Sequence, residues 1–269
     1  MKPIATTGIP ASIPHTPAGA DFLEAARVVH GPAHIIGRVF LKAEQALRER
    51  GITLSFASFE ELVAANRSNS ATWRPLLPIF DPDFGGLDAR NSYCLLGRNG
   101  RGEVVASQGG RLYEWADTNF FEEAASMRLF YPDPARPMPP AEGVVITAER
   151  TKRISGRVVF SVAGWYRPDY RKKDLGVILS RVSRALAYTR WKTDATVTIM
   201  AEGVFKGGFP ERAGYTNFDW ELNLQNFAVG TVRTAVLWMP ETQMLDDFSW
   251  FLDAFETGVD GRTYYRSAH

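Results

Sequence analysis

A buried strand that leads through a short basic loop into a long helix constrains the fold of this chain most. Arg157–Tyr166 is apolar enough for a buried strand, and Asp174–Arg190 repeats apolar residues at helical spacing. Another apolar strand, Ala195–Ala201, follows the helix. A strand, a helix and a second strand in this order predict one crossover connection, so the sheet is not expected to be purely antiparallel.

Two hairpin patterns lie on either side of this unit. Tyr93–Gly97 and Glu103–Tyr113 have the composition of strands, and the Asn99-Gly100 pair between them is a strong turn signal. Glu221–Val229 and Thr231–Trp238 form a second hairpin-like pair. Together these segments predict an α/β (mixed α+β) fold, with a largely antiparallel mixed sheet flanked by helices.

Further helical patterns lie near both ends and in the middle of the chain. They comprise Asp21–Arg50, a helix that begins at the N-cap Ser58, Asn119–Phe130 and Leu245–Phe255. We expect an N-terminal arm and helical extension over residues 1–50 and a central domain over residues 51–240. An insertion at 118–140 and a C-terminal helix and tail at 241–269 complete the expected organisation.

Composition narrows the class of protein. Hydrophobic residues make up 45% and charged residues 23% of the 269 residues, which is typical of a folded globular chain. The formal net charge is only +1, so we expect neither a general nucleic-acid binder nor a membrane-surface binder. The N-terminal stretch lacks the basic start and apolar run of a signal peptide, and no stretch approaches the roughly 18 apolar residues of a membrane span. A cytoplasmic protein is expected.

Side chains that bind metals or act as nucleophiles are sparse. Cys94, the only cysteine, lies in an apolar run typical of a buried strand, so we expect neither an internal disulfide nor a reactive thiol. His30 and His34 are separated by Gly31-Pro32, which breaks the helical geometry that a metal-binding pair would need. No cluster of Cys, His and carboxylates has ligand spacing, and no metal site is expected.

The loop between the buried strand and the long helix carries the features of an anion site. Pro168 ends the strand, and the backbone N–H groups that follow are the unpaired donors of a helix start, where the macrodipole favours negative charge. Arg171–Lys173 adds formal positive charge at the same point. Gly176 has no side chain, so a ligand has room beside the backbone. These features together indicate a seat for a pyrophosphate.

At these residues the chain resembles the Gcn5-related N-acetyltransferase (GNAT) superfamily. The family signature is Arg or Gln, two residues, Gly or Ala, one residue, and Gly or Ala, which here becomes Arg171-x-x-Asp174-x-Gly176 after a Pro-Asp-Tyr lead-in. The resemblance implies acetyl-CoA or another acyl-CoA as acyl donor. It implies pantetheine contacts along Gly164, Trp165 and Tyr166, and pyrophosphate contacts at Arg171, Lys172, Lys173, Asp174, Leu175 and Gly176.

The order of the predicted elements also resembles this family. A hairpin, the motif strand and helix, the next strand and a final strand pair follow one another as the family would give them. Gly208–Tyr215 resembles the family segment Phe-Tyr-Glu-Arg-x-Gly-Phe. Three departures stand out, which are Asp174 at a Gly or Ala position, Pro210 at the position of a frequent general-acid tyrosine, and the long insertion Thr118–Pro140.

Catalytic groups for acyl transfer are harder to assign. The motif strand offers Ser161 as its polar side chain, where the family often has a Glu. Glu202, at the end of the neighbouring strand, is a candidate base, with a solvated strand-end acid as the alternative. Tyr215 is a candidate proton donor, with a packed aromatic residue as the alternative.

Another open point concerns the arginines on the helix after the motif. Arg181, Arg184 and Arg190 either form a solvated helix face or hold the 3′-phosphate of coenzyme A.

Two functions fit these observations. The first is an acyl-CoA-dependent N-acyltransferase that transfers an acyl group to a small amine or amino-acid-like acceptor. The second is a non-catalytic GNAT-like protein that binds acyl-CoA or serves as a protein-interaction module. Under either function the terminal helices fit the interface of a homodimer or a lid.

Overall fold

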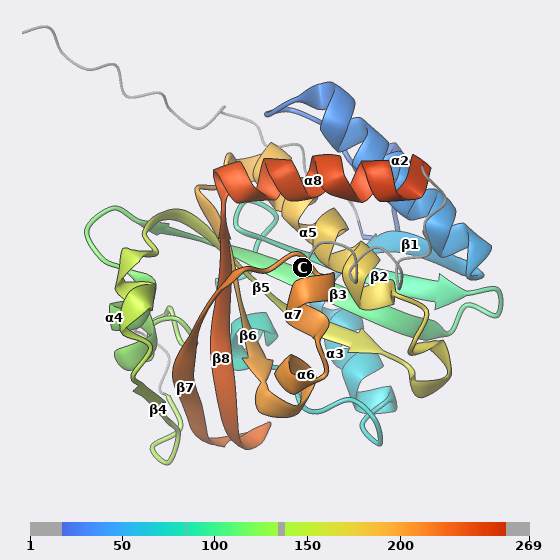
Figure 1. The fold of residues 1–269 in the computed structure, drawn as a ribbon. Coiled ribbons are helices and arrows are strands. Elements are labelled where there is room, and N and C mark those ends of the chain that lie inside the picture. The colour runs from blue at the N-terminus through green and yellow to red at the C-terminus, as the bar shows by residue number, and fades with distance from the viewer. Residues whose placement is uncertain (1–17, 85, 134–137, 257–269) are drawn as a thin grey trace, which may run out of the picture.

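One mixed sheet forms the centre of the molecule. The computed structural model describes residues 18–84, 86–133 and 138–256. The strands are β1 (Ile52–Ala57), β2 (Ser92–Asn99), β3 (Val104–Trp115), β4 (Gly143–Ile146), β5 (Gly156–Tyr166), β6 (Ala195–Ala201), β7 (Asn217–Phe227) and β8 (Gly230–Pro240). They lie in the order β1-β2-β3-β5-β6-β8-β7-β4 (Figure 1), and β5 with β6 is the parallel pair. The predicted largely antiparallel mixed sheet is confirmed.

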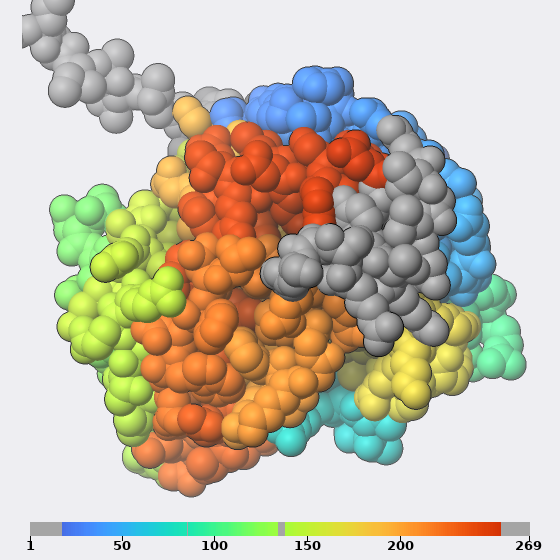
Figure 2. All heavy atoms as spheres, viewed as in Figure 1, coloured from blue at the N-terminus to red at the C-terminus, as the bar shows by residue number. Residues whose placement is uncertain are grey.

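Helices cover both faces of this sheet. The α-helices are α1 (Phe22–Ala25), α2 (Ala33–Glu49), α3 (Phe59–Ser68), α4 (Phe120–Ala125), α5 (Leu175–Trp191), α6 (Glu202–Lys206), α7 (Phe209–Arg212) and α8 (Glu241–Glu256). Short 3-10 turns are η1 (Pro78–Phe80), η2 (Glu149–Arg153) and η3 (Pro168–Tyr170). One apolar core lies between the sheet and helices α1, α2, α5 and α8, and a second lies between the sheet and helices α3 and α4. Figure 2 shows α8 seated beside the N-terminal helices, with the segment around residues 200–220 below it.

The long helix α5 packs as its periodicity predicts. Its apolar stripe is buried in the first core and consists of Leu175, Ile178, Leu179, Val182 and Leu186. The predicted helix at Ser58 is also confirmed, and its start has a capping box in which the Ser58 hydroxyl accepts from the Glu61 N–H. Within the described ranges, no helix is long and apolar enough to cross a membrane.

Three helices differ in extent from the sequence pattern. The predicted helix Asp21–Arg50 is broken, because Gly31 has a positive φ of 86° and Pro32 lacks an N–H, so α2 begins only at Ala33. The predicted helix Asn119–Phe130 ends at Ala125. At the C-terminal end α8 begins at Glu241, directly after β8.

The arginines of α5 are the clearest correction. Arg181 and Arg184 are 0% exposed, so neither a solvated face nor a contact with the 3′-phosphate of coenzyme A describes them. Both pair with the carboxylate of Asp247 on α8, at 2.7 Å from Arg181 and 2.8 Å from Arg184. Arg184 also donates to the carbonyl oxygen of Ala213 at 2.8 Å. The two arginines therefore face α8, and their ion pairs with Asp247 join α8 to α5.

Candidate functional site

A cleft opens where two neighbouring strands separate. β5 and β6 are paired at three positions, the last of which joins Phe160 to Val197. Beyond that point β5 stays paired with β3, and β6 stays paired with β8 as far as Ala201. The cleft has a volume of about 700 Å³, and its walls include the residues that follow the last pair on both strands, Ser161–Tyr166 and Thr198–Ala201.

A bulge in β5 faces this cleft. Gln108 of β3 stands opposite two residues of β5, Ala163 and Gly164, because the register shifts between Ser107 and Gly109. Ala163 has a positive φ of 60°, and its carbonyl oxygen accepts a hydrogen bond of 2.6 Å from the Ser107 hydroxyl. Gly164 is exposed and lines the cleft. Since a left-handed residue changes the direction of the peptide groups beside it, the bulge interrupts the regular edge of β5 at the cleft.

The loop after β5 forms the other end of the cleft. Lys172 and Asp174 have positive φ values of 61° and 56°, and α5 begins at Leu175. Among the described residues, the backbone N–H groups of residues 172–177 meet no hydrogen-bond acceptor. Successive free N–H groups in a turn with left-handed residues, followed by a helix start, form a concave anion site. These N–H groups lie in the segment that the sequence analysis predicts as a pyrophosphate seat.

Arg50, which is not among the residues that line the cleft, holds this loop. Its Nε donates to the carbonyl oxygen of Lys173 at 2.7 Å, and its Nη1 donates to that of Ala46 at 2.7 Å. The Arg171 side chain donates to the carbonyl oxygen of Tyr166 at 3.1 Å. The carbonyl of the peptide between residues 173 and 174 therefore faces Arg50. Its N–H, on the opposite side of a trans peptide, faces away from Arg50.

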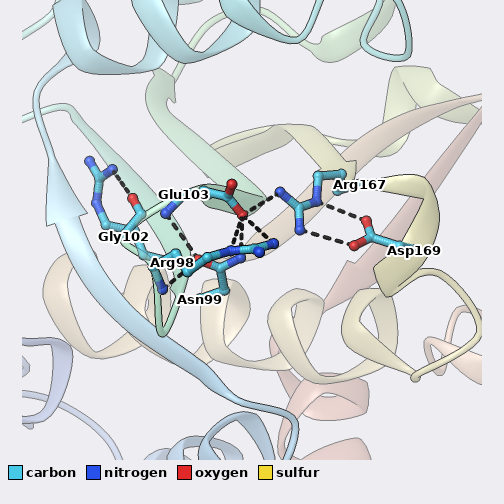
Figure 3. A network of polar contacts seen from close by, with 7 residues as sticks. Arg98, Asn99, Gly102, Glu103, Arg167 and Asp169 are labelled. Carbon is cyan, nitrogen blue, oxygen red and sulfur yellow. Dashed lines mark hydrogen bonds and ion pairs between the residues drawn. The ribbon is translucent and has the colours of Figure 1, made fainter.

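An ion-pair network fixes the start of the same loop (Figure 3). Arg167 forms a bidentate pair with Asp169 at 2.8 and 2.9 Å and also donates to Glu103 at 2.9 Å. Asn99 donates to the same Glu103 oxygen at 2.6 Å. These hydrogen bonds, from Asn99 and then Arg167, lower the pKa of Glu103 to about 2. The network thereby ties the β2–β3 hairpin to the loop that precedes α5.

The predicted motif residues occupy different environments. Asp174 takes the N-cap position of α5, and its side chain accepts no capping hydrogen bond. Leu175 is 2% exposed and its side chain belongs to the core. At Gly176, an added Cβ would lie 2.5 Å from the ring of Phe209 and 3.2 Å from that of Tyr166. This glycine lines the cleft, and the space beside its Cα holds an aromatic ring of the protein.

The two candidate catalytic residues lie in unlike places. The Glu202 carboxylate pairs with Lys206 at 2.8 Å and with Arg233 at 2.9 Å, and these hydrogen bonds lower its pKa. Glu202 is not among the residues that line the cleft. Tyr215 does line it, with its ring against the Arg184 guanidinium at 5.1 Å. Tyr166 lines the cleft too, and burial raises the pKa of its hydroxyl.

One wall of the cleft has no counterpart among the predicted site residues. It is formed by Trp73–Leu77, which follows α3 and carries no motif. Trp73 stacks on Trp165 with ring centroids 4.6 Å apart and planes at 3°. Gln108 also lines the cleft, and its amide donates to the Ser161 hydroxyl at 3.0 Å. The Trp-Arg-Pro sequence gives a turn-like signal but no sign that it lies against β5.

No protein-family model and no curated protein sequence matches this chain. Among solved structures, a mutant of spermidine N-acetyltransferase from Vibrio cholerae aligns with a TM-score of 0.45 and 8% identity, over 74% of this chain and 98% of that chain. The same enzyme in complex with CoA and spermine aligns with a TM-score of 0.40 and 9% identity, over 73% and 99%. A putative acyl-CoA N-acyltransferase from Klebsiella pneumoniae aligns with a TM-score of 0.38 and 16% identity, over 70% and 97%. The observed order of a hairpin, the motif strand and helix, β6 and a final strand pair is the order that the sequence analysis predicted.

Proposed function

We propose that this protein is an acyl-CoA-dependent N-acyltransferase that acts on a small amine. The observation that carries the proposal is the run of N–H groups at residues 172–177, which meet no acceptor within the described part of the chain and lie at one end of a cleft opened by strand separation. Such a run suits a pyrophosphate, and Arg171 and Lys172 add positive charge beside it. Acetyl-CoA or another acyl-CoA is the proposed donor.

The rest of the cleft fits the other parts of such a donor. The edge of β5 beyond Phe160 is no longer paired with β6, so backbone groups that face this edge near Gly164 suit the amides of a pantetheine arm. The carbonyl oxygen of Tyr166 is an exception, because it accepts from Arg171. A thioester at the end of that arm would lie near the bulge at Ala163. There, peptide groups out of the regular ladder are suited to donate to a developing oxyanion.

Proton transfer is assigned to the phenols. Acyl transfer from a thioester to a neutral amine breaks the C–S bond and one N–H bond and forms a C–N bond, and the proton lost from nitrogen balances the proton taken up by the leaving thiolate. Tyr215 and Tyr166 both line the cleft and are the proposed donors of that proton. Glu202 has no part in this chemistry, because two cations hold its carboxylate outside the cleft lining.

Calorimetry with acetyl-CoA and free coenzyme A tests the binding step with a matched pair of variants. Gly164→Leu places a side chain in the cleft and should abolish detectable binding. Gly100→Leu adds the same bulk at the tip of the β2–β3 hairpin, where an added Cβ meets nothing within 4 Å, and should bind as the parent does. Parent protein that binds neither compound would contradict the proposal.

Asp174 provides a second test with the opposite sign. Its carboxylate stands beside the proposed pyrophosphate, where like charges repel. Asp174→Gly also suits the left-handed φ of 56°, so it should bind coenzyme A several-fold more tightly than the parent. The exposed Asp246→Asn variant removes the same charge on α8 and should leave the affinity unchanged.

Release of coenzyme A thiol across a panel of amines separates the two candidate functions. Thiol release that depends on an amine supports the acyltransferase. Tight binding without thiol release would instead favour the non-catalytic acyl-CoA-binding or protein-interaction module.

A further inference from the structure

The wall Trp73–Leu77 is held in place by contacts with two other elements. The Trp165 indole N–H donates to the carbonyl oxygen of Thr72 at 3.2 Å, and the two tryptophan rings stack. On the other side, the Asn66 amide of α3 donates to the carbonyl oxygen of Arg74 at 2.9 Å. The backbone of Arg74 is therefore fixed relative to both β5 and α3, so its side chain projects from a preorganised wall.

Arg74 carries the charge on this wall. Its side chain is exposed and lines the cleft, and no hydrogen bond or ion pair engages its guanidinium within the described part of the chain. Apolar residues also line the cleft, with Leu76 and Leu77 on the same segment and Ile199 on β6. A guanidinium beside apolar side chains is suited to a ligand with an apolar body and one anionic group.

Charge in the cleft is unevenly distributed. Among the described residues that line it, four are basic, namely Arg74, Arg171, Lys172 and Arg212, and one is acidic, namely Asp174. Arg171, Lys172 and Asp174 belong to the loop that is the proposed pyrophosphate seat. Arg74 comes from a separate segment, Trp73–Leu77, next to Trp73, whose ring lies against Trp165 of β5. A second anionic group, distinct from the phosphates, is therefore expected at this wall.

We propose that Arg74 binds a carboxylate of the acyl acceptor, so that the acceptor is a small amine that bears a carboxylate and an apolar side chain. This inference rests on the proposed acyl transfer. It excludes a polyamine as the preferred acceptor, because a polycation would meet Arg74 as a like charge. It makes Arg74 a residue that determines specificity, distinct from the groups that take part in proton transfer.

A carboxylate at this wall has a second possible source, the acyl group of a dicarboxylic acyl-CoA. A carboxylate from either source would make the same ion pair with Arg74. The two sources can be distinguished by adding or removing a carboxylate on the acceptor and on the donor separately. An acceptor carboxylate is lost when phenylalanine is replaced by phenethylamine. A donor carboxylate is gained when acetyl-CoA is replaced by succinyl-CoA.

Calorimetry with free coenzyme A already bound tests the inference without requiring turnover. Phenylalanine and leucine should bind the parent protein more tightly than phenethylamine, isopentylamine or spermidine. Arg74→Gln should weaken the binding of the two amino acids about tenfold to a hundredfold, which is the range for loss of a charge-assisted hydrogen bond. Arg67→Gln, which removes an exposed arginine of α3, should have no effect on either class.

Steady-state kinetics must then show in the parent the same preference for acceptors that bear a carboxylate, and a weaker preference in Arg74→Gln. With acetyl-CoA as donor, Arg74→Gln should raise KM for amino acids while kcat and the affinity for coenzyme A stay within about twofold to threefold of the parent. Equal or better binding of the amines without a carboxylate would overturn the inference, as would tight binding of spermidine. An Arg74 dependence that appears with succinyl-CoA and phenethylamine would assign the carboxylate to the donor instead. Failure of the parent to bind coenzyme A would refute the proposed function, a result distinct from all of these.

Discussion

Loss of the Asp247 carboxylate should destabilise the fold strongly. This side chain is buried and pairs with two arginines that are each 0% exposed, Arg181 at 2.7 Å and Arg184 at 2.8 Å. Asp247→Asn keeps the size of the side chain but removes the carboxylate that pairs with both buried guanidinium groups. Breaking a buried ion pair by removing one partner costs about 3–5 kcal/mol, because the remaining charge stays out of water without that partner. For a chain of this size, each kcal/mol lowers Tm by roughly 2–4 °C, so a fall on the order of 10 °C is expected.

Urea unfolding and thermal melts of the two variants Asp247→Asn and Asp246→Asn provide the measurement. Asp246 is the next residue on α8 and is exposed, so its replacement should change the free energy of unfolding by no more than about 0.5 kcal/mol. Both variants replace Asp by Asn in α8, so any change in helix propensity is similar in the two. The difference between their free energies of unfolding therefore reports the contribution of the buried carboxylate. If Asp247→Asn lies within about 1 kcal/mol of Asp246→Asn, the arginines are hydrated and α8 does not bury them as described.

Three further changes have defined outcomes. Arg50→Met removes the hydrogen bond to the carbonyl oxygen of Lys173 and should weaken coenzyme A binding roughly threefold to tenfold by calorimetry, whereas Arg67→Met should not. Because the pKa of Glu103 is lowered from an unfolded value of 4.5 to about 2, its carboxylate stabilises the fold above pH 4.5 and this stabilisation is lost as the pH falls toward 2. The free energy of unfolding of Glu103→Gln should therefore approach that of the parent as the pH is lowered through that window. Gly214→Ala combines a φ of 81° with a Cβ that would overlap the Asp247 carboxylate, so in urea unfolding it should cost more than Gly51→Ala, which bears only the strain of its φ of 70°.

Much of the sheet could be predicted because its signals are local. Ala195–Ala201 was predicted as a strand with the bounds that β6 has, and an Asn-Gly turn identified the first hairpin. The helical period of Asp174–Arg190 identified α5 and its buried stripe. The stretch from Glu202 to Gly214 contains α6 and α7, two helices of five and four residues that are too short to show a period.

Much of the site could not be predicted because its contacts are distant in sequence. The basic loop at Arg171–Lys173 carried its own signal, since charge and a helix start coincide there. Arg181 and Arg184 appeared exposed because the residue that buries them, Asp247, lies more than sixty positions away on α8. No sequence pattern marked Trp73 as a site residue, since it reaches the cleft through its stack on Trp165 of β5.

The helices outside the central sheet are therefore part of the site. Arg50, the residue that caps the C-terminal end of α2, fixes the peptide whose N–H belongs to the proposed pyrophosphate seat. On the same face of the sheet, Asp247 joins α8 to α5, the helix whose first turn supplies the remaining donors. A loop that offers unpaired N–H groups cannot hold its own shape through those groups, so its geometry must be set by contacts made through its carbonyl groups and by the helix behind it. We accordingly expect a chain that lacks residues 1–50 to lose affinity for coenzyme A even though every motif residue is retained.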